Sequence, residues 1–286
     1  MIVVCLRGRL GNQLFQYAAG RALALRLGVE LGLDKRVFTR TRRHNFGLDA
    51  FGIKTTLVKS AALPANDRGL RRRLRRLLRP QRRTPFSEFR EHDLTFDPAV
   101  LQLPDWTYLD GYFQSDLYFA DHAATIRTEL AVLPLQTPTN KLLGESIANC
   151  YAVSLHVRRG DYVTKAAYKS RFSTLGPDYY ARAVEAIAAR AKGRPTVFIF
   201  SDDPDWAEAN VRLEFPTHVV RQTGAAYEDI RLMAACHHHI IANSSFSWWG
   251  AWLNPLATKI VVAPATWFKD PTRDTSTLIP GDWLRI

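Results

Sequence analysis

The sequence has few cysteines and no long uncharged apolar run. Its 286 residues contain only three cysteines, Cys5, Cys150 and Cys236. Because they are odd in number and widely spaced, they exclude a disulfide framework and a zinc-ribbon spacing, and they fit a reducing compartment. No apolar stretch is long enough to cross a bilayer. The start, MIVVCLRGRLGNQ, has no basic region before its short apolar stretch, so we expect a first strand, no signal peptide, and a protein that is soluble or peripheral to a membrane.

Acidic residues are also scarce relative to basic ones, with 27 against 39 and a net charge of +12. Residues 68–83, RGLRRRLRRLLRPQRR, hold nine arginines and no acid, so the rest of the chain carries only +3. Four leucines in this segment form one stripe at helical spacing, and Pro80 ends the helix. The stripe consists of Leu70, Leu74, Leu77 and Leu78. Such a helix either lies on an anionic membrane surface or packs its leucines on the domain. No aromatic residues separate the arginines, so nucleic acid is not an expected partner.

The overall composition is that of a globular chain, with 47% hydrophobic and 23% charged residues. The N-terminal part predicts a βαβ unit, with a strand over 2–6, a glycine turn over 7–12, a helix over 13–27 and a strand over 29–33. The turn, with its GxxGNQ pattern, differs from the GxGxxG dinucleotide fingerprint. Residues 34–110 give no clear prediction.

From residue 151 onward, apolar strands and amphipathic helices alternate regularly, which predicts a doubly wound parallel sheet. Right-handed crossovers bring the carboxyl ends of such strands to one edge of the sheet. Polar clusters follow four of the strands. The expected strands are 151–158, 196–200, 218–220, 239–242 and 259–262, and the expected helices are 178–192, capped by Asp178, 204–213, 225–235 and 245–253. The clusters are His156 to Arg158, Ser201 to Asp203, Arg221 to Gln222, and Asn243 to Ser245.

The segment LHVRRGDY, residues 155–162, places two arginines at the end of a buried strand. Because side chains alternate along a strand, Arg158 and Arg159 face opposite sides and have different roles. Ser244 or Ser245 begins an aromatic-rich helix, either as a simple N-cap or as part of an anion site. A guanidinium beside a helix N-terminus suits a diphosphate, and the three tryptophans of the helix are expected to pack in the core.

The segment Ser201 to Asp203 offers two interpretations. A carboxylate at a strand end accepts hydrogen bonds from a guanine edge or from ribose hydroxyls. Alternatively, Asp203 and Asp205 match the DxD pattern that holds Mn²⁺ or Mg²⁺. Pro204, as the first residue of a helix capped by Asp203, argues against the metal. The run over 236–239, CHHH, is expected to supply buried or edge histidines and no metal site, because consecutive strand residues point to alternate faces.

Taken together, five motifs resemble, in order and spacing, the α1,2-fucosyltransferases of glycosyltransferase family 11. The motifs are GRLGNQLFQYAAGRALA at 8–24, DGYFQSDLYF at 110–119, HVRRGDY at 156–162, FSDDPDW at 200–206 and NSSFSWWGAWLNP at 243–255. The resemblance implies a GT-B type α/β fold with two Rossmann-like domains facing across a cleft, GDP-β-L-fucose as donor, inversion at the sugar carbon, and neither metal nor cofactor. It implies an acceptor-side domain over 1–138, with the basic insertion 68–83, and a GDP-fucose-binding domain over 139–286.

The resemblance also implies roles for individual residues. Arg158 stabilises the charge that develops on the β-phosphate. Asp161, which follows across the flexible Gly160, is the candidate general base, or else it only anchors Arg159 or the loop. Arg159 is expected to be a structural ion-pair partner. The implied donor-binding residues are Gly11 and Asn12 of the N-terminal loop, His156 and Asp202 at the guanine, Ser244 and Ser245 at phosphate, with Ser201, Asn243 and Phe246.

The expected function is therefore galactoside α1,2-fucosyl transfer by a bacterial-type cytoplasmic enzyme, with possible attachment to the membrane surface through 68–83. The acceptor is expected to be a galactose-terminated oligosaccharide or lipid-linked glycan, as in O-antigen, capsule or lipopolysaccharide assembly. Two alternatives stay open. One is a metal-dependent sugar-nucleotide transferase that uses Asp203 and Asp205. The other is a non-enzymatic protein that binds polyanions through its arginines.

Overall fold

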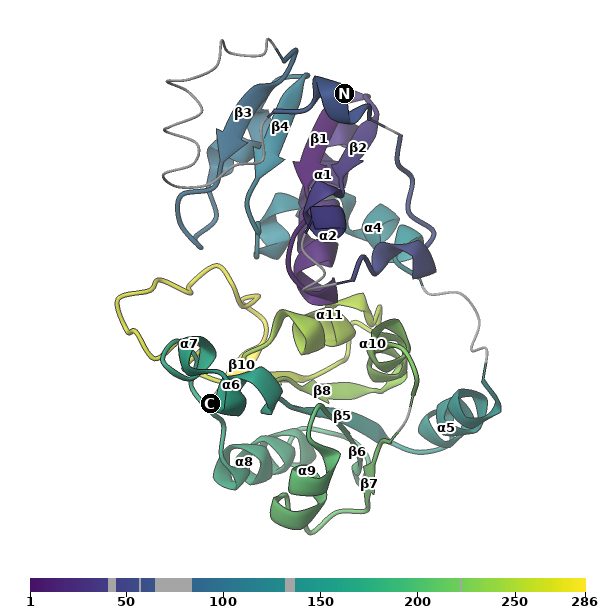
Figure 1. The fold of residues 1–286 in the computed structure, drawn as a ribbon. Helices are drawn as coiled ribbons and strands as arrows, with labels where there is room; N and C mark the ends of the chain where they lie inside the picture. Colours follow the sequence, from purple (N-terminus) through teal and green to yellow (C-terminus); the bar gives the residue numbers. More distant parts are fainter. Residues whose placement is uncertain (41–44, 57, 65–83, 132–136, 222) are drawn as a thin grey trace. The chain divides into compact units, whose positions relative to one another are not determined.

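The computed structural model describes residues 1–40, 45–56, 58–64, 84–131, 137–221 and 223–286 (Figure 1). Internal contacts divide the chain into two units, Met1–Glu129 and Leu130–Ile286. Each unit is built around a parallel β-sheet. The basic amphipathic helix expected over 68–83 and Gln222 lie outside the described residues.

The first unit has a four-stranded sheet in the order β2-β1-β4-β3, with all pairings parallel. The strands are β1 (Ile2–Cys5), β2 (Leu31–Asp34), β3 (Ser87–Arg90) and β4 (Thr107–Asp110). Every residue of β1 is buried, as expected for an apolar strand in the middle of a parallel sheet. The predicted βαβ opening is therefore confirmed, with the second strand two residues later than expected.

Helix α1 (Leu10–Leu27) links the first two strands and starts earlier than predicted. It includes Gly11 and Asn12, which the sequence placed in a loop. The Arg9 carbonyl accepts hydrogen bonds from the Asn12 and Gln13 amides, so the turn before Gln13 is already helical. The helix ends at Gly28 in the left-handed conformation, a common C-terminal cap.

Short helices complete the first unit. Among the described residues of this unit, two α-helices lie outside the central crossover and five short 3₁₀ segments connect the rest. The α-helices are α2 (Arg36–Arg40) and α4 (Ala123–Glu129), and the 3₁₀ segments are η1 (Leu48–Ala50), η2 (Ser60–Ala62), η3 (Pro98–Gln102), η4 (Asp116–Tyr118) and η5 (Ala120–His122).

The second unit has a six-stranded parallel sheet in the order β10-β9-β8-β5-β6-β7. The chain therefore moves outward in one direction from β5 to β7, and in the other direction from β8 to β10. The point where the direction reverses lies between β5 and β8, which is where open α/β sheets bind ligands. The strands are β5 (Ala152–Val157), β6 (Thr196–Ser201), β7 (Thr217–Val219), β8 (His238–Ile240), β9 (Val261–Ala263) and β10 (Leu284–Arg285).

Helices cover both faces of this sheet, with α8 and α9 on one side and α10 and α11 on the other (Figure 1). The four predicted helices are all present. Helix α8 begins at Pro177 after Gly176, so Asp178 lies in its first turn and does not cap it. The helices are α5 (Pro138–Ala148), α6 (Gly160–Thr164), α7 (Ala166–Lys169), α8 (Pro177–Ala188), α9 (Pro204–Asn210), α10 (Ala226–Ala235) and α11 (Ser245–Leu253).

The aromatic and histidine-rich segments are packed as the sequence suggested. The tryptophans of α11 are buried, and the Trp248 indole donates to the Leu278 carbonyl at 2.9 Å. His238 contacts the Tyr151 hydroxyl at 2.7 Å, whereas the next residue, His239, contacts Ser154 at 2.8 Å. The predictions of packing tryptophans and of buried, non-converging histidines are therefore confirmed.

No helix within the described ranges is both long and apolar enough to cross a membrane.

Candidate active site

The site begins where β5 and β6 end side by side in the second unit. The strands pair Val157 with Ser201, so the residues that follow them, Arg158 and Asp202, leave the sheet as neighbours. The Arg158 guanidinium and the Asp202 carboxylate form an ion pair of 2.6 Å. The Arg158 side chain is only 13% exposed. Strand register therefore creates a half-buried cation at the carboxyl edge of the sheet.

The Asp202 carboxylate is also held by the backbone of the arginine loop. Its second oxygen accepts a hydrogen bond from the Arg159 amide at 2.8 Å. Gly160 follows immediately and begins α6, so it is not the flexible link that the sequence suggested. A Cβ at position 160 would overlap the Asp202 carboxylate, which explains the glycine.

Arg159 points away from this pair and has the structural role predicted for it. Its guanidinium lies 3.4 Å from the Asp203 carboxylate and stacks 3.8 Å above the Trp206 ring. Asp203 caps α9 by accepting from the Trp206 amide, and Pro204 is the first helical residue, as predicted. Asp205 is 86% exposed and pairs with Arg221 at 2.7 Å. The two carboxylates of the DxD pattern thus interact with different arginines.

Asp161 lies in the first turn of α6. Its carboxylate forms an ion pair of 2.8 Å with Lys165, four residues later, and its side chain is 12% exposed. This pair is an ordinary intrahelical contact, and it gives the carboxylate a cationic neighbour at the edge of the site.

The N-terminus of α11 lies next to β5 across the point where the strand order reverses. Ser244 caps the helix by accepting from the Phe246 amide at 3.3 Å. Asn243 is 1% exposed, and its amide donates to the carbonyls of Ser173 and Trp267 at 2.8 and 2.9 Å. Asn243 therefore fixes the loop that starts the helix, while Ser245 and Phe246 are half-buried.

Tyr162 connects the arginine loop to that helix start. Its hydroxyl donates to the Asn243 carbonyl at 3.0 Å, and the Arg158 guanidinium lies 5.4 Å from the centre of its ring. The Tyr162 ring also stacks on Phe172 with 4.5 Å between centroids. The sequence analysis did not single out Tyr162. The available signal was its position in the HVRRGDY motif, four residues after Arg158.

His156 lies beneath the site. Its side chain is 3% exposed, and Nδ1 lies 2.9 Å from the Ser247 hydroxyl. Its ring also contacts the Phe246 ring at 5.5 Å. Burial, followed by the charge of Arg158, lowers the pKa of His156 to about 3. The imidazole is therefore neutral at physiological pH and joins β5 to α11.

A cavity of about 250 Å³ opens at the carboxyl ends of β6 and β7. The sequence predicted polar strand ends here but missed Asp229, which was read only as part of a helix. Its carboxylate accepts from the Thr223 hydroxyl at 2.6 Å, and burial raises its pKa to about 6. An acid in the first turn of a helix that follows a polar strand end was the available signal. The cavity is lined by Phe200, Ser201, Pro204, Val220, Arg221, Thr223 and Asp229.

In the first unit, Asn12 and Gln16 of α1 contact the turn after β4. The Asn12 side-chain oxygen accepts from the Gln114 amide at 2.8 Å, and the Gln16 amide donates to the Gly111 carbonyl at 3.0 Å. Gly8, ahead of the helix, has a positive φ of 80°. The motifs at 8–24 and 110–119 therefore meet through side-chain amides.

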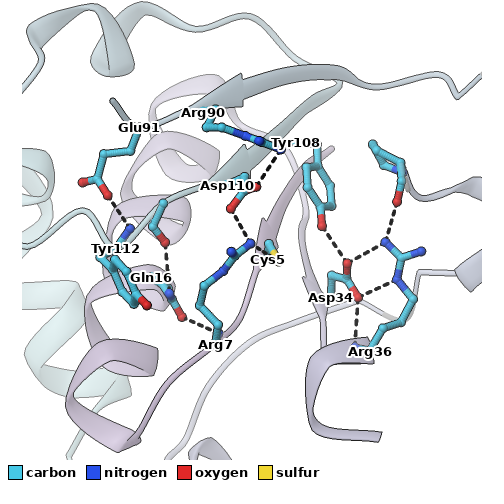
Figure 2. Close-up of polar contacts among 12 residues, drawn as sticks. Cys5, Arg7, Gln16, Asp34, Arg36, Arg90, Glu91, Tyr108, Asp110 and Tyr112 are labelled. Carbon is cyan, nitrogen blue, oxygen red and sulfur yellow. Dashed lines mark hydrogen bonds and ion pairs between the residues drawn. The ribbon is translucent and has the colours of Figure 1, made fainter. Parts of the chain in front are cut away.

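Charged residues gather at the carboxyl edge of the same sheet, as Figure 2 shows. Asp110 at the end of β4 pairs with Arg7 and, at 3.1 Å, with Arg90. Glu91 accepts hydrogen bonds from the amides of Tyr112 and Phe113 at 2.6 and 2.8 Å. Phe113 has a positive φ of 52°, so the carboxylate holds a strained turn in place.

Comparison with known sequences now identifies the group to which this chain belongs. Residues 1–286, the whole chain, match the profile of Glycosyl transferase family 11. The chain is a member of this family. It is therefore a glycosyltransferase, as predicted from its motifs.

Curated relatives of this family 11 chain act in glycan synthesis. The O-antigen biosynthesis glycosyltransferase WbnK of Escherichia coli is 32% identical, with 99% of both chains covered. An alpha-1,2-colitosyltransferase of Escherichia coli is 29% identical over 100% of this chain and 99% of its own. A galactoside alpha-(1,2)-fucosyltransferase 1 of Saimiri sciureus is 26% identical over 86% of this chain and 63% of its own length.

Solved structures of low sequence identity share the fold of this family 11 chain. Arabidopsis thaliana FUT1, solved with GDP, matches with a TM-score of 0.52 at 12% identity, covering 91% of this chain and 69% of its own. The NodZ alpha-1,6-fucosyltransferase co-crystallised with GDP matches with a TM-score of 0.50 at 15% identity, covering 87% and 91%. The predicted fold class is confirmed as α/β of the GT-B type with two Rossmann-like units.

Proposed function

We propose that this family 11 enzyme transfers L-fucose from GDP-β-L-fucose, with inversion, to the 2-hydroxyl of a galactose-terminated glycan. The observation that carries the proposal is the Arg158 guanidinium at the end of β5, which Tyr162 links to the loop that starts α11, at the point where the strand order of the second sheet reverses. A half-buried arginine and a helix N-terminus at this position suit a diphosphate. Relatives named as an α1,2-colitosyltransferase and a galactoside α1,2-fucosyltransferase support the linkage.

In the reaction, the acceptor 2-hydroxyl oxygen attacks the anomeric carbon of fucose. The bond from that carbon to the β-phosphate oxygen breaks, and its electron pair leaves with GDP. Arg158 stabilises the negative charge that develops on the β-phosphate. Asp202 holds this guanidinium at 2.6 Å, so the cation has a fixed orientation.

Asp161 is the proposed acceptor of the hydroxyl proton. Its carboxylate lies in the turn that follows Arg158, and Lys165 is its neighbour at 2.8 Å. To accept the proton, the carboxylate exchanges Lys165 for the acceptor hydroxyl. If Asp161 only anchors α6, its amide variant keeps full activity.

The remaining donor contacts are proposed from the family pattern. Ser244 and Ser245 lie at the α11 N-terminus and are assigned to phosphate, and Asn243 holds that terminus in place. We propose that residues 1–138 form the acceptor-side domain and residues 139–286 the donor domain. The other proposed donor-binding residues are Gly11, Asn12, His156, Ser201, Asp202 and Phe246.

The reaction is proposed to need no metal ion. The guanidinium and the helix N-terminus supply positive charge where the leaving group forms. Asp203 caps α9 and contacts Arg159, while Asp205 pairs with Arg221, so each carboxylate of the DxD pattern already has a partner. A metal-dependent reaction through Asp203 and Asp205 is the alternative that a chelator tests.

The acceptor is proposed to be an O-antigen-type glycan at the cytoplasmic face of the membrane. The name of WbnK supports a role in O-antigen synthesis. The nine arginines of 68–83 suit contact with anionic lipid headgroups. A colitose nucleotide is a second candidate donor, because the colitosyltransferase is 29% identical over the whole chain.

The test is turnover of GDP-fucose with lactose as acceptor, in EDTA, with GDP release and product linkage followed together. We expect an α1,2-linked product from the wild-type enzyme without added metal. A dependence on Mn²⁺ would overturn the metal-free mechanism. A preference for the colitose nucleotide over GDP-fucose would make the colitose nucleotide the donor. No turnover of any nucleotide sugar, with polyanion binding instead, would contradict the enzyme assignment.

A further inference from the structure

An open pocket lies at the amino edge of the first sheet, where its strands begin. Its volume is about 850 Å³, within the about 300–1,000 Å³ typical of sites for small organic ligands. It is lined by Met1 before β1, Glu30 before β2 and Trp106 before β4. Arg7 and Asp110 lie at the carboxyl edge (Figure 2), and β1, four residues long, separates the two edges by about 13 Å. The pocket is therefore distinct from that charged cluster.

Trp106 is the residue of this pocket that packing alone does not explain. It is 48% exposed, although burial of an indole is strongly favourable. Its φ of 60° lies in the left-handed region, which is uncommon for a residue with a large side chain. The Phe86 ring, with 5.4 Å between centroids, and the Asp105 carboxylate, which accepts from the Trp106 amide at 2.7 Å, hold this conformation. Backbone strain that keeps an aromatic ring exposed is typical of a binding site.

Residues 53–56 form another wall of the pocket, and their backbone is held in place. The Thr56 amide donates to the Leu31 carbonyl of β2 at 2.8 Å. The Lys54 amide donates to the Tyr17 hydroxyl at 3.2 Å. This fixed wall therefore offers the ammonium group of the exposed Lys54 and the hydroxyl of Thr56 to a ligand.

The charges around the pocket nearly cancel, which decides the kind of ligand. The Arg21 guanidinium donates to both carboxylate oxygens of Glu129 at 2.7 to 3.1 Å, so its charge is neutralised within the protein. Among the described lining residues, Lys54 and Glu30 carry the remaining side-chain charges, one of each sign. Such a pocket does not favour an anion. An exposed indole beside separate donors and acceptors suits a neutral sugar, whose apolar face stacks on the ring while its hydroxyls bond to the polar groups.

We propose that this pocket is a second glycan site, in which a sugar ring stacks on Trp106 and its hydroxyls bond to Lys54 and Glu30. The site is separate from the place where the acceptor receives fucose. Its ligand is a neutral oligosaccharide, either a distant part of the acceptor glycan or a separate chain. Only the link to the acceptor rests on the proposed function. Two sites on one glycan would raise the effective concentration of its reacting end.

The first experiment observes Trp106 directly by ¹⁹F NMR of the protein labelled with 5-fluorotryptophan. The chain has seven tryptophans, and the signal that disappears in Trp106→Phe is that of Trp106. Lacto-N-neotetraose, a neutral tetrasaccharide, is expected to shift this signal saturably in the absence of any donor. Inorganic phosphate is expected to leave it in place, because the lining charges cancel. A signal that the tetrasaccharide does not move, or that phosphate moves instead, overturns the inference.

The second experiment tests the polar contact with a variant that leaves Trp106 and its packing intact. Lys54→Met removes the ammonium group and is expected to weaken tetrasaccharide binding about threefold to tenfold, the effect of one charge-assisted hydrogen bond. Lys141→Met, at an exposed position on α5, is the matched control and leaves the affinity unchanged. The same affinity in Lys54→Met and in the wild type overturns the inference.

Acceptor kinetics distinguish the two sources of the glycan. If the pocket binds a distant part of the acceptor, Trp106→Ala raises KM about tenfold for long galactose-terminated glycans, while kcat and the KM for lactose stay unchanged. If it binds a separate chain, KM is unchanged for every acceptor length while the tetrasaccharide still shifts the wild-type Trp106 signal. Fucose transfer without that shift overturns this inference alone. The shift without transfer of fucose from GDP-fucose contradicts the proposed function alone.

Discussion

Gly160 lies so close to the Asp202 carboxylate that any larger residue at position 160 would collide with it. The same carboxylate orients Arg158 and accepts from the Arg159 amide. A residue with no side chain therefore controls the position of the proposed catalytic arginine. Gly160→Ala is expected to displace Asp202 and to lower kcat about tenfold to hundredfold, because misplacement by about 1 Å has that effect.

The control for this change is Gly176→Ala, at the start of α8. A Cβ there meets no atom within 4 Å. This variant is expected to keep wild-type kcat, with at most a small loss of stability because Gly176 is the N-cap of α8. If Gly160→Ala keeps wild-type kcat while remaining folded, the steric argument fails.

The two arginines of HVRRGDY are expected to respond differently to substitution. Arg158→Ala removes the proposed stabiliser of the leaving group and is expected to lower kcat by about a hundredfold or more with little change in thermal midpoint. Arg159→Ala removes the contacts with Asp203 and Trp206, so it lowers stability by about 1 kcal/mol while kcat stays within about threefold. Steady-state kinetics and thermal unfolding of both variants check the contrast, and equal loss of kcat in both would contradict it.

Substitutions of Asp161 and Lys165 distinguish a catalytic role of Asp161 from a role in anchoring α6. If Asp161 accepts the proton, Asp161→Asn lowers kcat about a hundredfold. Lys165→Ala breaks the same ion pair but leaves the carboxylate, so kcat is retained. Equal effects of the two substitutions would assign the pair to the structure of α6.

Stability should depend on pH through Asp229. Burial raises the pKa of Asp229 from 3.8 to about 6, so the folded protein binds the proton more tightly than the unfolded chain. The free energy of unfolding therefore falls as pH rises from about 4 to about 6, by roughly 1–3 kcal/mol, and then levels off. Asp229→Asn is expected to flatten this dependence in calorimetric melts and to melt above the wild type at pH 7. A parallel pH dependence in both proteins would contradict the assignment.

Glu91 is expected to stabilise the turn at Tyr112 and Phe113. Its carboxylate accepts from both amides, whereas a glutamine offers one acceptor and turns its amino group toward a donor. Glu91→Gln should lower the free energy of unfolding by about 1–3 kcal/mol. Glu88→Gln, an exposed position on β3, the strand that ends just before Glu91, should change it by less than about 0.5 kcal/mol. Denaturant titration of both variants checks the difference.

Sequence patterns predicted the second unit well because its signals are local. Apolar runs predict β5 and β6. Pro204 after Asp203 marks the start of α9, because the Asp203 side chain accepts a hydrogen bond from the Trp206 amide only three residues later. The helix that begins at Ser245, after its cap Ser244, was likewise predicted from the cap and the residues that follow it.

Contacts between distant segments could not be predicted in the same way. The Arg158–Asp202 pair joins positions 44 residues apart and depends on the register of two strands. The reason for Gly160 appears only when that pair is in place, and the motif alone suggested flexibility. In the sequence, Asp229 cannot be distinguished from any other acidic residue of a helix. The cavity that it lines exists only because the ends of β6 and β7 lie beside it in the fold.

Asp202 gives Arg158 an internal counter-ion. Because the guanidinium is paired within the protein, it is not a bare cation toward phosphate or other small anions of the cell. A ligand must replace one carboxylate contact with bonds of its own, and a diphosphate that also reaches the helix N-terminus does so better than a single phosphate. Under the proposed function, the ion pair that orients Arg158 therefore also selects a diphosphate over single anions.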